Sequence, residues 1–240
     1  MVVRNHEIEF ASGALVFPGG RVDDDDQVIA ADPARFPAGH GLDAEQAALR
    51  VAAIREMFEE TGILLARSHG ASTLVPAGQL QDMESQRVAV NAGGLSFAGF
   101  LANESLVLAP DLLVRFAHWI TPVTMSKRYD THFFMAVAPP DQLAVHDGSE
   151  AVDSVWITPQ DAIVGSVTGK YKLLFPTEMN LGKLARHTDA AAAMTAASAA
   201  RIVPVQPVML TNDNGVRTMR IPVEADYGGE LFQANNPLAI

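Results

Sequence analysis

The segment that most constrains this chain begins at Arg55, ends at Ile63 and reads R-E-M-F-E-E-T-G-I. Glu56, Glu59 and Glu60 stand at i, i+3 and i+4, so a helix would carry all three on one face. Like charges at this spacing repel each other, and the C-terminal end of a helix already carries partial negative charge. Oxygen ligands without cysteine or histidine nearby suit a hard cation, so we predict a site for Mg²⁺ or Mn²⁺.

The preceding residues predict the helix that carries these carboxylates. Asp43 followed by Gln46 fits a capping box at the start of a helix, and Gly62 fits a cap at its end. The apolar residues on a different side from the glutamates form the predicted core-facing stripe: Ala47, Val51, Ile54 and Phe58. One helix can therefore pack against the core and bind a metal.

Together with F-P-G-G ending at Gly20, this segment resembles the Nudix box, G-x5-E-x7-R-E-U-x-E-E-x-G-U with U aliphatic. Members of this family hydrolyse the diphosphate of nucleoside diphosphates linked to another group. The second half of the box matches at every defined position. The resemblance implies an α/β fold, an α/β/α sandwich with a mixed sheet, here extended by a C-terminal helix and a β-hairpin.

The first half of the box departs from the motif. Gly20 and Arg55 are 35 positions apart where the motif has 14, so 21 extra residues split the box. Counted back from Arg55, the first glutamate of the motif falls on Ala47. The extra residues, about 21–42, include four aspartates from position 23 to 26, and we predict that they form a solvated loop.

The split is similar to a branch of the family that includes peroxisomal coenzyme A diphosphatases and bacterial relatives. Further matches to this branch are H-W-I-T-P at 118–122, R-Y-D-T-H-F-F at 128–134, and W-I-T-P at 156–159 after Glu150. Coenzyme A or acyl-coenzyme A is therefore the expected substrate, with other nucleoside diphosphate derivatives as alternatives.

The resemblance also implies roles for single residues. Glu56, Glu59 and Glu60 would hold the metal together with backbone of the Gly19–Gly20 turn, Gly20 in particular. Glu59 or Glu150 would accept the proton of the attacking water, and Arg55 would fix the carboxylates.

Three basic residues are candidates for binding a substrate phosphate: Arg21, Lys127 and Arg128. For Lys127 and Arg128, a role as ordinary surface charges is an equally good interpretation.

Composition limits the classes of molecule that the protein is expected to bind. A net charge of −11 argues against nucleic acid and anionic membrane, but not against a small phosphorylated substrate that a cation neutralises. The chain has no cysteine, which fits a cytoplasmic protein. Its seven histidines show no short pairing, so we expect no zinc site, and His118 and His132 are predicted to lie in the core or in a pocket wall. Both tryptophans, Trp119 and Trp156, are predicted core residues.

We expect a Nudix domain over residues 1–185 and a C-terminal extension over 186–240, packed on the same domain. Predicted strands cover 2–17 (broken at 12–13), 118–121, 132–138, 202–209 and 216–221. Predicted helices cover 79–92, 159–164, 177–187 and 189–201. Residues 1–4 resemble the interior of a strand, and related chains usually carry another strand before it. An open sheet edge there would favour a homodimer.

The competing hypothesis is a catalytically impaired Nudix-fold module that binds or senses a ligand. The split box and Ala47 favour this hypothesis. The three crowded carboxylates favour the hydrolase, because a decayed site has little reason to keep them.

Overall fold

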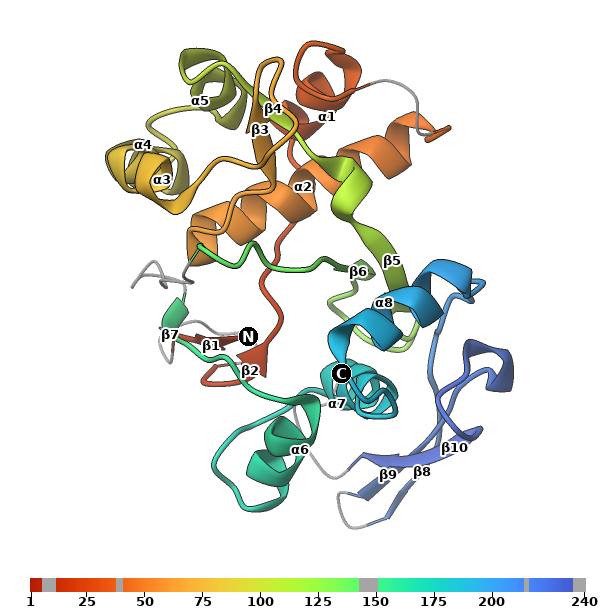
Figure 1. Ribbon diagram of the computed structural model, residues 1–240. Helices are drawn as coiled ribbons and strands as arrows, with labels where there is room; N and C mark the ends of the chain where they lie inside the picture. The colour runs from red at the N-terminus through yellow and green to blue at the C-terminus, as the bar shows by residue number, and fades with distance from the viewer. Residues whose placement is uncertain (6–11, 38–40, 143–150, 214–215, 235–240) are drawn as a thin grey trace.

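The computed structural model describes residues 1–5, 12–37, 41–142, 151–213 and 216–234. Its helices are α1 (Asp24–Ala31), α2 (Ala44–Thr61), α3 (Ala77–Asp82), α4 (Glu84–Asn91), α5 (Phe97–Asn103), α6 (Pro159–Val167), α7 (Phe175–Leu184) and α8 (Ala190–Ala199). Its strands are β1 (Val2–Arg4), β2 (Leu15–Val16), β3 (Ala66–Ser68), β4 (Leu106–Leu108), β5 (Val114–Ile120), β6 (Asp130–Met135), β7 (Ala151–Ser154), β8 (Val208–Asp213), β9 (Val216–Arg220) and β10 (Leu231–Ala234). Figure 1 shows α1 to α5 with β3 and β4 at the top, and the remaining elements below them.

Helix α2 forms as predicted. The side chain of Asp43 accepts from the backbone N–H of Gln46 at 2.8 Å, and Gly62 ends the helix at φ 72°. The predicted apolar stripe is at most 6 % exposed and lies in the core that α1 to α5, β3 and β4 share, here called the upper core. There the ring of Phe58 stacks on that of Phe100 with centroids 5.0 Å apart. Burial of this stripe holds α2 against α5, β3 and β4, and leaves its other faces for the site.

The residues inserted into the box are not the solvated loop that the sequence predicted. Residues 24–31 form α1, and the carboxylate of Asp26 accepts from the backbone N–H of Asp23 at 2.8 Å. Carboxylates in the first turn are favourable because that end of a helix is partially positive. Ile29 anchors α1 in the upper core at 1 % exposure. Residues 24–31 of the insertion are therefore a folded part of the helical body.

In the part of the chain that the structure describes, the strands form four small sheets, ordered β2-β1-β7, β10-β9-β8, β3-β4 and β5-β6. All pairings of named strands are antiparallel. Within the described residues, parallel pairing occurs only at isolated bridges, Ala14 with Lys172 and Trp119 with Val205. Parallel and antiparallel pairing, which we expected within a single sheet, is thus distributed over several short sheets and isolated bridges.

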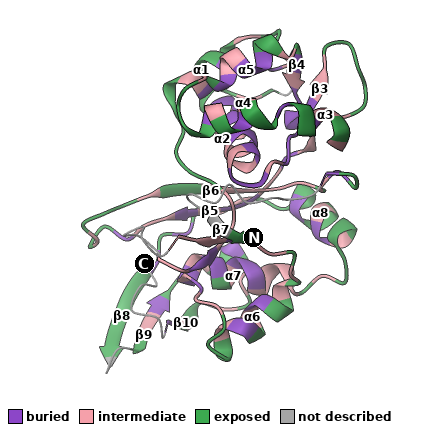
Figure 2. Ribbon diagram, turned by 90° about the vertical axis from the view of Figure 1, so that its left-hand side faces the viewer, coloured by how far each residue is buried: buried purple, intermediate pink, exposed green. Residues whose placement is uncertain are grey.

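The expected C-terminal helix and hairpin are present as α8 and the β8–β9 pair, to which β10 adds a third strand. Figure 2 shows these elements below the helices α1 to α5, together with β5, β6 and α7. Trp119 is 3 % exposed, as predicted, and its indole N–H donates to the Tyr227 hydroxyl at 2.9 Å. The prediction for Trp156 was wrong, because that side chain is 68 % exposed.

Two further expectations need correction. The predicted helix over 79–92 is two helices, α3 and α4, which meet at Met83. Strand β1 pairs with β2 on one side and β7 on the other, so it is not an open edge and gives no reason to expect a homodimer.

Among the described residues, no helix combines the length and apolar character needed to cross a bilayer.

Candidate active site

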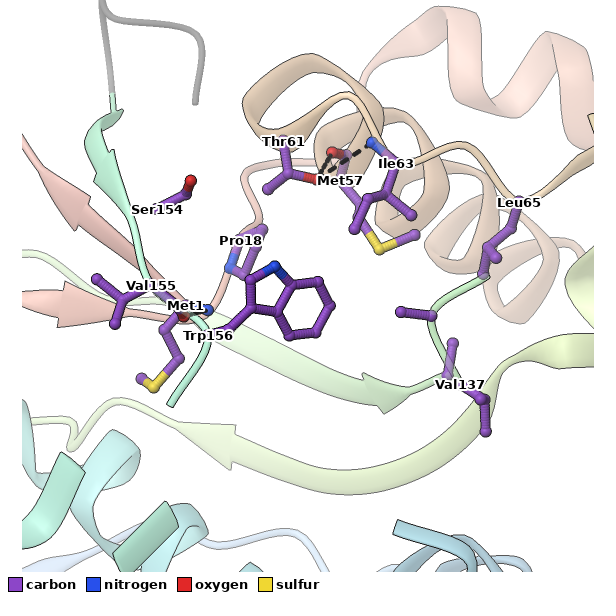
Figure 3. Close-up of a pocket in the computed structure, with 12 residues that line it drawn as sticks. Met1, Pro18, Met57, Thr61, Ile63, Leu65, Val137, Ser154, Val155 and Trp156 are labelled. Carbon is purple, nitrogen blue, oxygen red and sulfur yellow. Dashed lines mark hydrogen bonds between the residues drawn. The ribbon is translucent and has the colours of Figure 1, made fainter. Parts of the chain in front are cut away.

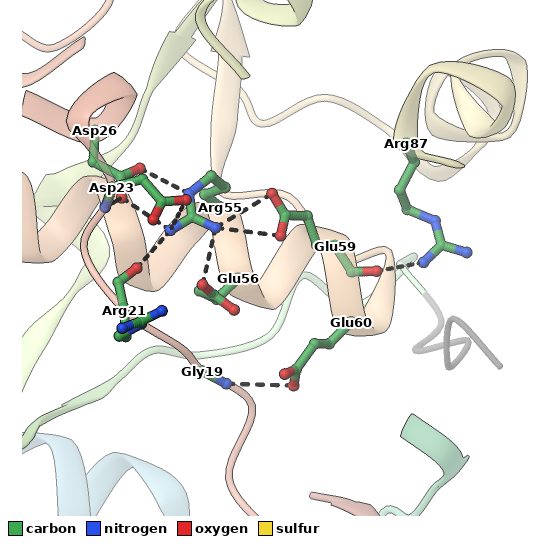
Figure 4. Close-up of polar contacts among 9 residues, drawn as sticks. All are labelled: Gly19, Arg21, Asp23, Asp26, Arg55, Glu56, Glu59, Glu60 and Arg87. Carbon is green, nitrogen blue, oxygen red and sulfur yellow. Dashed lines mark hydrogen bonds and ion pairs between the residues drawn. The ribbon is translucent and has the colours of Figure 1, made fainter. Parts of the chain in front are cut away.

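Arg55 is the centre of the polar cluster on α2 (Figure 4). Its side chain is 6 % exposed, and its Nε and Nη2 atoms donate to the two oxygens of Asp26 at 2.8 and 2.9 Å. Nη2 also donates to the carbonyl of Arg21 at 2.8 Å, while Nη1 donates to Glu56 at 2.9 Å and to Glu59 at 3.2 Å. A planar guanidinium with five donors is the side chain that can make all these bonds at once.

Asp26 is the functional residue that the sequence analysis missed. Its side chain is completely buried and lies at the sixth position after Gly20. Counted forward from Gly20, G-x5-E therefore places its acidic residue on Asp26. Counting backward from Arg55 crossed the insertion and reached Ala47, which is a buried core residue. The acidic partner of Arg55 is thus present, and the extra residues follow it.

The three glutamates occupy different surroundings. The side chains of Glu56 and Glu59 are 13 % and 14 % exposed and are both bonded to Arg55. Glu60 is 4 % exposed and accepts from the backbone N–H of Gly19 at 3.3 Å. The helix thus directs Glu60 to the Gly19–Gly20 turn, whereas Arg55 holds the other two carboxylates.

Gly20 lies in close contact with the carboxylate of Glu56. A Cβ atom at this position would lie 2.3 Å from Oε1 of Glu56, far inside any real contact distance. The turn therefore brings its backbone directly against a box carboxylate, as expected if the turn and the carboxylate serve one ligand.

Burial and charge shift the ionisation of this cluster. Burial alone would lower the pKa of Arg55, but its hydrogen bond to Asp26 and the charges of Glu56, Asp26 and Glu59 raise that pKa well above its usual value. Desolvation raises the pKa of Glu59, and the opposing effect of Arg55 does not cancel it. Glu59 is consequently a stronger base than an exposed glutamate.

The end of α2 is held by a second arginine. Arg87, on α4, is 5 % exposed and donates to the backbone carbonyl of Glu59 at 2.8 Å, while Glu84 neutralises it at 2.6 Å. A cation at the C-terminal end of a helix is favourable because the free carbonyls there are partially negative. This contact fixes the backbone beneath the carboxylates.

The predicted phosphate-binding residues are not brought together. Arg21 joins the cluster through its backbone carbonyl, and its side chain is exposed. Lys127 and Arg128 are exposed in the β5–β6 connection, where Arg128 donates to the Thr121 carbonyl and Lys127 lies over the Tyr129 ring. Glu150 lies outside the described residues.

An apolar cavity of about 170 Å³ borders this cluster (Figure 3). Met57 and Thr61 of α2 line it, as does Pro18, which directly precedes the Gly19–Gly20 turn. Its other walls come from the start of the chain, the segment after β6 and the end of β7: Met1, Val137 and Trp156 among others. A ligand that reaches the carboxylates can therefore place an uncharged portion here.

The β5–β6 pair holds a second polar cluster. Register places His118 opposite His132, and the two rings stack with centroids 4.0 Å apart. His118 bonds to Asp130, and these three side chains offer ligand atoms within 4.8 Å of one another. The two histidines are partly buried, and their pairing was missed because they are far apart in sequence. Aligning the two predicted strands as a hairpin would have revealed it.

Comparison with known proteins agrees with this geometry. Residues 34–183 match the family described as the NUDT19 Nudix domain. The chain is 26 % identical over 189 residues to putative nudix hydrolase 7 of Caenorhabditis elegans, covering 79 % of this chain and 56 % of that protein. It is 31 % identical over 151 residues to acyl-coenzyme A diphosphatase NUDT19 of Gallus gallus, covering 54 % of this chain and 38 % of that protein.

A crystal structure of a NUDIX hydrolase from Alicyclobacillus acidocaldarius superposes with a TM-score of 0.65 at 27 % identity, covering 83 % of this chain and 88 % of that one. The buried Arg55 clamp and these matches together define the class of protein. The chain belongs to the Nudix hydrolase family, and within it to the NUDT19 Nudix domain family. It spans about half the length of the curated relatives it matches.

Proposed function

We propose that this protein hydrolyses the diphosphate bond of a nucleoside diphosphate derivative with the help of a divalent cation. The observation that carries the proposal is the clamp around Arg55, which gathers Glu56 and Glu59 beside the Gly19–Gly20 turn. Water would attack one phosphorus atom, the bridging P–O bond would break, and two phosphate-terminated products would leave.

The residues present fit a hard cation. Glu56 and Glu60 approach the Gly19–Gly20 turn, and a Cβ at Gly20 would fill the space against Glu56. These two carboxylates and a backbone carbonyl of the turn are the oxygen ligands that Mg²⁺ and Mn²⁺ prefer, which leaves Glu59 to act as the base. When bound, the cation would neutralise phosphate oxygens and lower the pKa of a water molecule.

Glu59 is the best placed base among the described residues. Its carboxylate is largely desolvated, which raises its pKa, and Arg55 fixes its position at 3.2 Å. A base with a raised pKa holds a proton more readily as the attacking water loses one. Arg55 would orient the base and is itself held by Asp26.

The proposed substrate is coenzyme A or an acyl-coenzyme A. Two observations support it: the similarity to a protein named acyl-coenzyme A diphosphatase, and the apolar cavity beside the carboxylates. An uncharged arm attached to the diphosphate could pack against Met57 and Trp156, while a purely polar substrate would gain little there. Other nucleoside diphosphate derivatives are the alternative.

A ligand-binding module without catalysis has less support than the sequence suggested. That hypothesis rested on the absence of an acidic partner for Arg55, and Asp26 supplies this partner at 2.8 Å. The split of the box is also no sign of decay, because α1, which carries Asp26 and runs into the extra residues, packs in the core through Ile29.

The test is a hydrolysis screen with Mg²⁺ or Mn²⁺ over coenzyme A, ADP-ribose, NADH and dinucleoside polyphosphates. Glu59→Gln and Glu60→Gln are the active-site variants, and Glu45→Gln, at an exposed position of the same helix, is the matched control. We expect both active-site variants to lose at least about 100-fold in kcat, as removal of a general base or metal ligand does. Near-normal turnover in both would overturn the proposal, and binding without cleavage by the unaltered protein would favour the module.

A further inference from the structure

Helix α2 and the β5–β6 pair bring two arginines together. Arg115 on β5 lies opposite Phe134 on β6, and the guanidinium of Arg50 on α2 lies 5.3 Å from the centre of the Phe134 ring. Residues opposite each other in an antiparallel pair point to the same face. His132, two positions before Phe134, shares that face, and its Nδ1 is 3.4 Å from Nη2 of Arg115.

No carboxylate of the described residues neutralises either guanidinium. Nε of Arg115 is buried without a hydrogen-bond partner in the described part of the chain, and Arg50 donates only to the carbonyl of Gln46 there. None of the ion pairs among the described residues includes either arginine. Burial first, and then the positive charge of the nearby Arg115, lower the pKa of Arg50. Partly buried cations that repel each other are costly unless an anion binds between them.

A cation fits this place less well, although His118, Asp130 and His132 could form a metal group. Arg115 places a positive charge beside His132 and donates to its Nδ1. The proton of the neutral ring is then on Nε2, which faces Asp130. A metal-binding histidine needs the opposite arrangement, with an acceptor at its second nitrogen.

We propose that Arg50 and Arg115, with His132 beside them, bind a phosphate monoester of the substrate that is separate from the diphosphate to be cleaved. The inference rests on the proposed function, since it assigns a second anchoring point to the same substrate. Arg50 and Met57 are seven positions apart and share one stripe of α2, which places them about 10 Å apart along the helix. A nucleotide can span that length while its diphosphate reaches the carboxylates and its apolar arm enters the cavity.

Coenzyme A and 3′-dephospho-coenzyme A differ by one phosphate monoester and are the matched substrates for the test. We expect the unaltered protein to show a KM about tenfold lower for coenzyme A, the size of a charge-assisted contact. Arg115→Gln and Arg50→Gln should bring the two KM values together with little change in kcat. Arg201→Gln, at an exposed position, should leave the preference intact.

Calorimetry with adenosine 3′,5′-bisphosphate and with AMP gives a measurement that does not depend on hydrolysis. The bisphosphate should bind about tenfold more tightly than AMP, and Arg115→Gln should remove the difference. Asp130→Asn should strengthen the binding, because it removes a carboxylate that contacts both histidines. If no substrate is cleaved, the proposed function fails while this comparison still decides the anion site.

Three results would overturn the inference. The first is equal binding of both nucleotides by the unaltered protein. The second is an equal loss of affinity for both nucleotides in Arg115→Gln. The third is tight Zn²⁺ binding that Asp130→Asn abolishes and Arg115→Gln strengthens, which would assign the cluster to a metal.

Discussion

Asp26 and Arg55 are 29 positions apart in the chain, and in the fold both oxygens of the Asp26 carboxylate accept hydrogen bonds from Arg55 at 2.8 and 2.9 Å. This pair joins the helix inserted into the box to the helix that carries the box. It also explains how Glu56 and Glu59 keep their positions, because the same guanidinium bonds to them.

Asp26→Asn should destabilise the protein by roughly 3 kcal/mol, because it leaves a buried guanidinium without its main partner. Urea unfolding measures the loss, and Asp24→Asn, at an exposed position of the same helix, is the control. In the double variant Asp26→Asn/Arg55→Met the loss should be smaller than the sum of the single losses. Strict additivity would show that the two residues are not coupled.

Gly20→Ala should reduce kcat by about 100-fold or more while the protein stays folded, because the new Cβ displaces the Glu56 carboxylate. The measurement is steady-state hydrolysis together with a thermal melt. Gly78→Ala, in α3 with nothing within 4 Å of the added atom, should leave kcat unchanged. Normal turnover of Gly20→Ala would separate Glu56 from the catalytic site.

The pH profile of kcat/KM should report Glu59. Desolvation raises the pKa of this group above its ordinary value of 4.5, so activity should fall as pH drops through a point above 4.5. The sign follows from its role, because a base must be deprotonated to act. Glu59→Gln should remove this acidic limb from the residual activity, and a limb that persists unchanged would assign the base to another group.

Trp156→Ala should raise KM for acyl-coenzyme A about tenfold, the effect expected when a ligand can no longer stack or pack on one aromatic ring. The melting temperature should change little, because the side chain is 68 % exposed and belongs to no core cluster among the described residues. Met209→Ala, at an exposed position of β8 far from the cavity lining, is the control. An unchanged KM would remove Trp156 from substrate binding.

Stability should fall as the solution is acidified from pH 6.5 towards 4. Burial first, and then the charges of His118 and Arg115, lower the pKa of His132 to about 4, against the raising effect of Asp130. The unfolded chain therefore binds a proton in this window that the folded one does not. The contribution of His132 to the free energy of unfolding is fully present above pH 6.5 and declines as the pH falls from 6.5 towards 4. His132→Asn should flatten this part of the urea-unfolding profile, and an identical slope in both proteins would contradict the assignment.

The predictions that succeeded concern residues close in sequence. The carboxylate spacing and the buried stripe of α2 follow from 3.6 residues per turn. The cap at Asp43 and the stop at Gly62 follow from the capping preferences of these two residue types. Local patterns also found β5, β6, β9 and the helices α6 to α8, whereas the predicted strand over 202–209 shares only residues 208–209 with β8. The error over 23–26 arose because acidic runs are usually solvated, and nothing local shows that Asp26 has a buried partner.

The sequence alone therefore determined the chemical groups of the site and the helix that carries them, since helix periodicity is a property of consecutive residues. Tertiary structure decided which distant groups meet: Asp26 with Arg55, Gly20 with Glu56, and Arg50 with Arg115. Such pairings depend on how the inserted helix and the β5–β6 pair pack against α2, and packing depends on the shape and burial of the entire core. That is why the carboxylates could be predicted and their partners could not.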